Sequence, residues 1–251
     1  MMRVWDIHPG YLDRGGLLGQ HAEIHAVWSV LRGCKGGYSR HPEVLRWRGH
    51  EARLAIVHEI TVREMGLRGF DHASPLDGVG SSDNPPSLPS RLISPGEQLE
   101  LVGAKLARRG RQGRIPLPKR ISWYWAQHKY SVMARGYRRY RDVARTMARR
   151  EDCRPSVGED MILQIMEEMA HPITPGAMRN TSYHLWGYVK RPAGAGERKV
   201  FFEMVERGEY LLALEMVYRI AERHRIVYLL HSSVFADAPF EAPEADKASG
   251  H

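Results

Sequence analysis

Residues 16–33, GLLGQHAEIHAVWSVLRG, carry the first helical pattern of the sequence, and most of the chain repeats this kind of pattern. Leu17, Ile24, Trp28 and Leu31 recur at roughly helical spacing, so they should face a core. The glycine at the end of the stretch supplies a stop signal. The stretch therefore predicts a long helix near the start of the chain, with one apolar face.

A neighbouring stripe of this predicted helix carries small residues around a single carboxylate. Gly19, Ala22 and Ala26 lie on the same side as Glu23, because residues three and four apart share a helix face. Small side chains leave room above the carboxylate. We therefore expect that a bulky ligand can approach Glu23.

Further helical patterns lie outward from this stretch. One begins at Pro42, a residue suited to the first helical turn, and Gly49 is expected to divide it into pieces at 42–48 and 51–68. Residues 72–95 are rich in Pro, Ser, Gly and Asp, which predicts an exposed loop. Helices are expected again at 96–110, 125–151, 158–172, 178–191, 197–208 and 209–225.

The predicted fold class is all-α, because no convincing strand pair accompanies these helices. Two small helical domains are expected, at 1–117 and 118–237, and the long Pro/Ser/Gly loop lies inside the first. Residues 111–120, RQGRIPLPKR, read as a basic, proline-containing linker between them. The polar, proline-containing tail at 238–251 is expected to be disordered.

The composition narrows the class of partner. The formal net charge is +8 and the pI is near 9.6, which favours a polyanionic partner such as nucleic acid or an acidic surface. Cys34 and Cys153, the two cysteines, indicate neither a disulfide framework nor a cysteine-based metal site. No apolar run is long enough to span a bilayer and no signal peptide is evident, so the predicted location is the cytoplasm, without a membrane partner.

One segment of the chain is strongly basic. Residues 101–141 contain a dozen Lys and Arg residues, no acidic residue, and six interleaved Trp and Tyr residues. Arginines and aromatic rings together suit phosphate contacts and base stacking. The alternative is a solvated helix face whose aromatic rings turn inward. We favour nucleic-acid contact, because so many like charges repel one another unless counter-charge arrives.

The thirteen histidines do not form a recognisable metal-binding motif. His21 and His25 lie four residues apart, but the sequence places no third ligand at a suitable spacing beside them. The pair also lacks the HExxH order of zinc proteases. We therefore predict no metal site and no cofactor.

The amino-terminal third also carries a recognisable family pattern. MRVWDIHPGYLDRGGLLGQHAEIHAVWS at 2–29, KGGYSRHPEVLRWRGH at 35–50 and HEITVREMGLRGF at 58–70 resemble the pyrimidine-dimer DNA glycosylases of the phage endonuclease V type. The resemblance covers roughly residues 2–117. It implies an all-helical enzyme that removes a damaged base and then cleaves the strand at the abasic site.

The resemblance also implies site residues. The nucleophile of such enzymes is the amine of the first mature residue, which corresponds here to Met2, and the partner carboxylate corresponds to Glu23. The residues expected to contact damaged double-stranded DNA are Arg3, His21, Lys35, Arg40, Arg46 and Arg48.

An α-amine suits this chemistry. Its reference pKa implies that about 10–20% is neutral at pH 7, against less than about 0.1% for a lysine. The chain begins Met-Met, and a bulky second residue normally prevents removal of the initiator. Either translation starts at Met2 or the amine is displaced by one residue.

The second half resembles the YbgA-like helical domains, through WAQHKYSVMAR at 125–135, MRNTSYHLWGYVKR at 178–191 and RIVYLLHSSVF at 225–235. This resemblance supplies no catalytic role, and other nucleic acid is an expected partner of this domain. Three functions stay open: a dimer-specific glycosylase and abasic-site lyase, a noncatalytic DNA- or RNA-binding protein, and an enzyme acting on another modified base.

Overall fold

The computed structural model describes residues 2–33, 38–78 and 87–237. Within these residues the fold is all-helical and contains no strand, which confirms the predicted fold class. The helices are α1 (Arg14–Leu31), α2 (Pro42–Trp47), α3 (Glu51–Leu67), α4 (Pro95–Arg109), α5 (Ile121–Arg135), α6 (Tyr137–Ala148), α7 (Glu159–Ala170), α8 (Pro175–Val189), α9 (Ala195–Glu206), α10 (Tyr210–Arg223) and α11 (Val227–Leu230), with two 3-10 turns, η1 (Pro9–Tyr11) and η2 (Ser233–Phe235). The tail predicted to be disordered lies outside the described residues.

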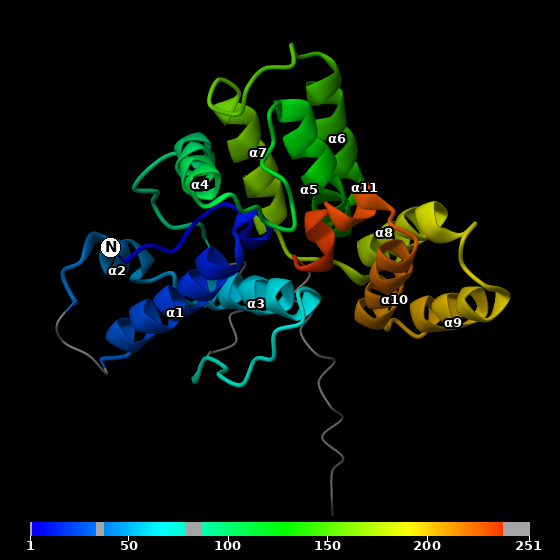
Figure 1. Ribbon diagram of the computed structural model, residues 1–251, viewed down its shortest axis with the longest axis horizontal. Coiled ribbons are helices and arrows are strands. Elements are labelled where there is room, and N and C mark those ends of the chain that lie inside the picture. The colour runs from blue at the N-terminus through cyan, green and yellow to red at the C-terminus, as the bar shows by residue number, and fades with distance from the viewer. Residues whose placement is uncertain (1, 34–37, 79–86, 238–251) are drawn as a thin grey trace, which may run out of the picture.

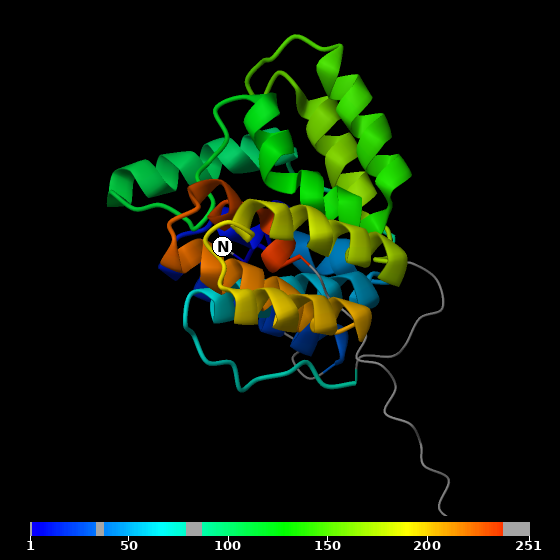
Figure 2. The ribbon, with the colours of Figure 1, turned by 90° about the vertical axis from the view of Figure 1, so that its right-hand side faces the viewer.

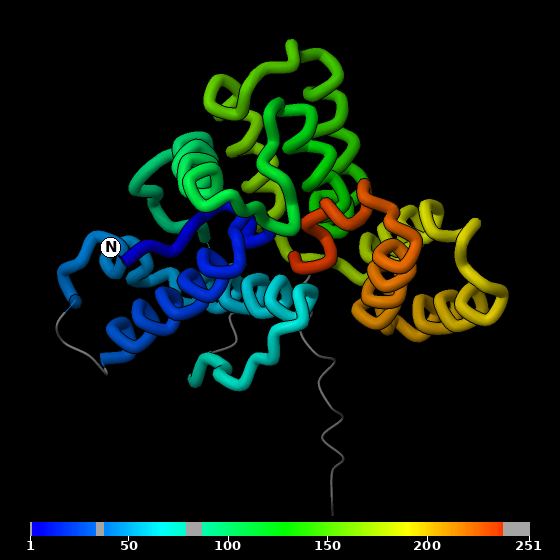
Figure 3. The backbone as a smooth tube through the Cα atoms, viewed as in Figure 1, coloured from blue at the N-terminus to red at the C-terminus, as the bar shows by residue number. Residues whose placement is uncertain are grey.

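The helices form three groups in space (Figure 1). α1, α2 and α3 lie together at the amino-terminal side, α5, α6 and α7 stand as a bundle beside α4, and α8, α9 and α10 form the third group. Figure 2 shows the same arrangement from the side, and the tube of Figure 3 shows the chain passing from one group to the next. No helix in the described part of the chain has the length and apolar character needed to cross a membrane.

Helix ends follow the capping residues of the sequence. α1 begins after Asp13, whose buried carboxylate accepts a hydrogen bond from the backbone N–H of Gly16 at 2.7 Å. α2 and α3 are separate helices, as predicted, because Gly49 between them takes φ +81°. The single helix predicted at 125–151 is instead two, since the chain turns at Gly136 and α6 folds back against α5. The rings of Trp125 and Tyr140 stack across this hairpin, with centroids 5.5 Å apart.

An apolar core crosses the predicted domain boundary at residue 117. Tyr11 and Leu17 from the amino-terminal part are fully buried in the same cluster as Ile162 and Ile165 of α7. A second cluster, around Trp47, joins α1, α2 and α3 with Val4 of the amino-terminal segment, and a third, around Phe201, belongs mainly to the last helices. The two-domain division stays a prediction, and the two predicted domains share one core.

The middle of the segment predicted to be a linker is packed against the rest of the chain, while residues 111–112 and 119–120 at its ends are exposed. Ile115 is fully buried, and its backbone N–H donates to the carbonyl oxygen of Gly10 at 2.9 Å. Gly113 approaches the backbone of Gly10 and Tyr11 so closely that any side chain at this position would collide with it. The segment thus connects the two halves and also fixes them to each other.

A buried ion network joins the same parts of the chain. Glu64 on α3 is 0% exposed and accepts hydrogen bonds from Arg68 at 2.8 Å and from Arg114 at 2.7 to 3.0 Å. Arg68 also donates to the carbonyl oxygen of Leu12 at 2.7 Å, and Arg114 to that of Ser232 at 3.1 Å. One carboxylate therefore connects α3, the start of α1, the connecting segment and the carboxyl-terminal segment.

Replacement of Glu64 by glutamine should lower the free energy of unfolding by about 3–5 kcal/mol, because two buried guanidinium groups lose their counter-charge. Urea denaturation followed by circular dichroism measures the change. The matched control is Glu167→Gln, an exposed glutamate on α7, which should change stability by less than about 0.5 kcal/mol. Equal stabilities of the two variants would contradict a structural role for the network.

Candidate active site

Side chains from three helices hold the first residues of the described chain. The backbone N–H of Val4 donates to Oε1 of Glu43 at 3.0 Å, and its carbonyl oxygen accepts from Arg46 at 2.7 Å. The next two backbone N–H groups donate to the side-chain oxygens of Gln20, at 3.2 Å, and Gln98, at 2.8 Å. The amino-terminal segment thus has a fixed course although it belongs to no helix.

The residues that hold this segment are themselves buried and paired. Glu43 is 1% exposed, and its Oε1 also accepts from Arg46 at 2.8 Å and from Nε1 of Trp47 at 3.1 Å. Arg46 completes its contacts with Asp6 at 2.9 Å. A buried, fully paired set of charges has little freedom to move, so it gives the amino end a rigid seat.

α1 carries Glu23 on the side that the sequence predicted. Glu23 is half-buried, while the neighbouring Gly19 and Ala22 are exposed, so small residues do flank the carboxylate. Burial raises the pKa of Glu23, and the nearby negative charge of Glu43 raises it further. Met2 packs against an apolar cluster that contains Ile24 of α1. The same helix therefore supports Met2 and carries Glu23, although no direct contact between these two residues is evident.

The residues expected to contact DNA lie in different surroundings. Arg40 and Arg48 are exposed, and Arg3 lies over the ring of Trp5 with its guanidinium carbon 5.1 Å from the ring centre. Arg46 is buried in the seat of the amino-terminal segment, so its guanidinium is not presented to a ligand. Lys35 lies outside the described residues.

In the long basic segment, six of the twelve Lys and Arg side chains form ion pairs with acidic residues. Arg114 contacts Glu64, and Arg135 forms a buried ion pair with Asp237 at 2.7 Å. Arg139 pairs with Glu168 of α7 at 2.7 Å.

The aromatic rings of the basic segment are divided between the interior and the surface. Tyr124 and Tyr130 are buried, whereas Trp123 and Tyr137 are about half exposed. Part of the segment thus follows the alternative reading of inward-turned rings. The nucleic-acid role of this segment stays a prediction.

Polar residues in the middle of α5 are also internal. His128 is fully buried, where its Nε2 lies 2.7 Å from the hydroxyl of Tyr11 and its Nδ1 lies 2.9 Å from Oγ of Ser233. Burial is the main reason that the pKa of His128 lies well below its usual value. His128 therefore ties the amino-terminal turn to η2, and a neutral imidazole suits that position.

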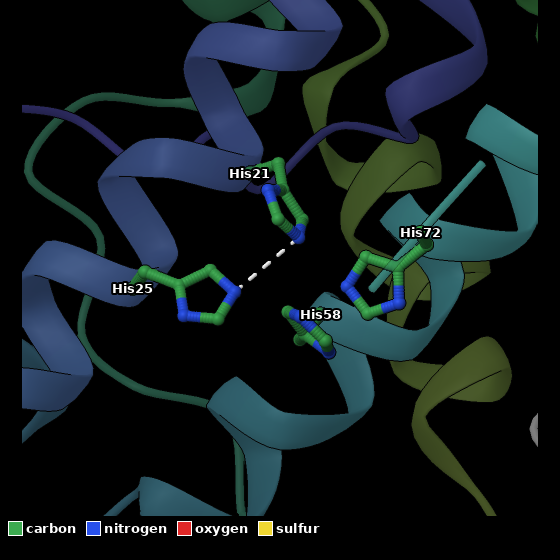
Figure 4. A group of neighbouring side chains, drawn as sticks. All are labelled: His21, His25, His58 and His72. Carbon is green, nitrogen blue, oxygen red and sulfur yellow. Dashed lines mark hydrogen bonds between the residues drawn. The ribbon is translucent and has the colours of Figure 1, made fainter. Parts of the chain in front are cut away.

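Four histidines converge beside α1, an arrangement that the sequence analysis missed. His21 and His25 from α1 meet His58 from α3 and His72 from the loop that follows α3 (Figure 4). One ring nitrogen from each lies within 4.8 Å of those from the other three. The expectation that His21 and His25 lack further ligands nearby is therefore wrong. Their i, i+4 spacing was visible in the sequence, but the packing of α1 on α3 was not.

Two separate parts of the all-helical chain match known family models. Residues 2–77 match the family model described as pyrimidine dimer DNA glycosylase, and residues 129–239 match the model described as protein of unknown function (DUF1722). These matches confirm the two-part architecture inferred from sequence resemblance. No curated protein and no solved structure matches the chain.

The raised pKa of Glu23 has a consequence for stability. A carboxyl group whose pKa is higher in the folded than in the unfolded state binds its proton more tightly when folded, so its contribution to stability falls as pH rises through that range. Glu23→Gln should therefore be more stable than the wild type at pH 7. The difference should shrink as the pH falls through the raised pKa and should be smallest below 4.5, the ordinary pKa of the group. Urea denaturation at pH 7 and at a pH below 4.5 measures the difference in stability. A variant less stable than wild type at pH 7 would contradict this account.

Proposed function

We propose that this protein is a DNA glycosylase with abasic-site lyase activity on pyrimidine dimers in double-stranded DNA. The family match of residues 2–77 supports the glycosylase reaction. The observation that carries the finer mechanism is the seat of the amino-terminal segment, in which buried Glu43 and Arg46 hold the backbone of Val4. A reaction that uses the terminal amine requires a fixed amino end, since nucleophile and substrate must be held in line.

In the proposed reaction the neutral α-amine of Met2 attacks C1′ of the damaged nucleotide. The glycosidic bond to the base breaks with its electron pair, and the sugar ring opens as the nitrogen loses a proton and forms an imine with C1′. Loss of a proton from C2′ then expels the 3′ phosphate by β-elimination, and water releases the enzyme from the sugar. Glu23 would carry these protons and stabilise the cationic intermediate, and its raised pKa suits a group that exchanges protons.

The proposed DNA contacts are those basic side chains that the fold leaves near the surface. Arg40 and Arg48 are exposed on either side of α2, and Arg3 lies one residue beyond the proposed nucleophile. These residues would hold phosphates, while the damaged base leaves the stack more easily because its pairing is already weakened. Arg46 is assigned to the seat of the amino end, and His21 to the histidine group.

Borohydride should trap the protein covalently on ultraviolet-irradiated duplex and on abasic duplex, because it reduces the imine to a stable amine. Glu23→Gln should lower the rate of trapping and nicking on irradiated DNA by about 10²-fold or more, the usual size of a general acid–base contribution. Glu167→Gln, which changes an exposed helical glutamate, is the matched control and should react like the wild type. Salt-sensitive binding without any adduct would instead favour a noncatalytic nucleic-acid binder, and trapping on abasic DNA alone would point to another lesion.

The position of the amine is tested by comparing two proteins, one that begins at Met2 and one that retains Met1, with both ends defined by mass spectrometry. The protein beginning at Met2 should be trapped faster, because its amine lies at the end of the held segment. Reductive methylation of the Met2 amine should make trapping slower than in either unmodified protein, because a dimethylated amine cannot form an imine. Equal trapping by all three preparations would contradict the amine as nucleophile.

Replacement of Arg48 by alanine should weaken DNA binding and reduce the slope of log K against log salt concentration by about 1, as expected for the loss of one phosphate contact. Fluorescence anisotropy over a salt series measures both quantities. Arg219→Ala, at an exposed site on α10, is the control and should leave the slope unchanged. An unchanged slope for Arg48→Ala would remove this residue from the interface.

A further inference from the structure

The histidine group of His21, His25, His58 and His72 has the geometry of a metal centre (Figure 4). Zinc binds imidazole nitrogens at about 2.0–2.1 Å, so neighbouring nitrogens of a tetrahedral site lie about 3.3–3.4 Å apart. The Nε2 atoms of His21 and His25 are separated by 3.3 Å. Two ligands are therefore already at the spacing that one tetrahedral ion requires.

The ring positions extend this agreement to all four residues. With the same bond length and the ring centre about 1.1 Å behind the nitrogen, the centres of adjacent imidazoles in a tetrahedral complex lie about 5 Å apart. The observed centroid separations are 4.6 Å for His21 and His25, 5.2 Å for His21 and His58, 5.0 Å for His21 and His72, 5.1 Å for His25 and His58, and 5.2 Å for His58 and His72. Five of the six ring pairs therefore lie near the separation that one tetrahedral ion requires.

The hydrogen bonds leave nitrogen lone pairs directed into this group. Nδ1 of His58 lies 3.1 Å from Oε1 of Glu59, and this hydrogen bond is the main reason that the pKa of Glu59 is lowered. An ionised carboxylate only accepts, so Nδ1 of His58 carries the proton and Nε2 keeps its lone pair. Nε2 of His58 and Nε2 of His72 are both buried and have no hydrogen-bond partner among the described residues. Buried polar atoms are rarely left unpaired, and a bound ion would account for both.

The protonation states suit metal binding as well. The pKa of His21 is lowered to about 4, first by burial and then by the neighbouring histidines, and that of His25 is lowered by the same causes. Imidazole binds metals in its neutral form, which a lowered pKa favours. The carboxylate of Glu59 behind His58 matches the carboxylate–histidine–zinc arrangement, in which an outer carboxylate orients the ligand and raises its basicity.

We propose that His21, His25, His58 and His72 bind one divalent transition-metal ion, with zinc as the preferred ion, in a four-coordinate site. A ligand set of four imidazole nitrogens disfavours the hard ions magnesium and calcium, which prefer oxygen. Four protein ligands also fill a tetrahedral shell, so the site is structural rather than catalytic. It joins α1, α3 and the loop after α3.

The proposed site bears on the candidate active site through the orientation of α1. Glu23 lies two residues from each of His21 and His25, which places it about 200° around the helix, on the opposite side. An ion bound by both histidines would fix the rotation of α1 and thereby the direction of Glu23. The glycosylase proposal does not depend on this ion, and metal content is measured without any DNA.

The test uses full-length protein without a histidine tag. The protein is stripped with a chelator, dialysed and titrated with zinc chloride in competition with a chromogenic chelator, and the metal content is measured by mass spectrometry. Wild type should bind one zinc ion per chain, and zinc should raise its melting temperature. Cobalt should give the intense visible bands of a tetrahedral site. Absence of stoichiometric zinc, or binding without the tetrahedral spectrum, would overturn the proposal.

The variants separate ligands from other histidines. His25→Ala and His72→Ala change half-buried residues and should abolish stoichiometric binding, while His184→Ala, at an exposed position on α8, should bind like the wild type. Glu59→Ala keeps all four ligands and should weaken zinc binding by about 10–100-fold. Circular dichroism checks that each variant is folded without metal. Retention of wild-type affinity by either folded ligand variant would show that these residues do not form the site.

Discussion

The fold depends on a carboxylate that cannot be left unpaired. Glu64 is buried, and the cost of removing its charge from water is offset only if cations and hydrogen bonds surround it. Arg68 and Arg114 supply both, and each arginine uses its remaining N–H groups on backbone carbonyls of other segments. The network therefore orients α3 relative to the start of α1 and to the carboxyl-terminal segment. It thereby bears on the position of α1, which carries Glu23 and packs directly on α3.

The shared core joins the two segments of the chain that match family models. Tyr11, next to the amino-terminal seat, and His128, at the edge of the second matched segment, meet through a 2.7 Å hydrogen bond in the interior. A displacement of the second segment would thus be transmitted to the residues that precede α1. The carboxyl-terminal part is in this sense a support for the amino-terminal part, whatever else it binds.

The helices and their stops were predictable from the sequence because they depend on local signals. Apolar spacing located α1, and a glycine located the division of α2 from α3. The open stripe around Glu23 followed from helical periodicity in the same way. Family resemblance, rather than any local signal, pointed to Met2.

The features that the sequence did not reveal depend on contacts between distant residues. The packing of α3 on α1 brings His58 and His72 next to His21. Nothing in the sequence distinguishes Arg46 from a surface arginine, because its partners Glu43 and Asp6 meet it only in the folded chain. The packing of the middle of the segment at 111–120 also depends on contacts with distant residues. Its prolines and charges are typical of a linker, yet Ile115 enters the core.

The seat of the amino-terminal segment uses side chains to satisfy backbone groups. In a sheet, a neighbouring strand would supply these hydrogen bonds, and the chain would be confined to β geometry on both sides. Here Glu43, Arg46, Gln20 and Gln98 bind the main chain of the segment much as a receptor binds a peptide ligand. Because the main chain is held in this way, the side chains of the segment are free for other contacts: Val4 and Trp5 are buried in the core, and Asp6 pairs with Arg46. A short segment without regular secondary structure is thus held through its backbone and its side chains at once.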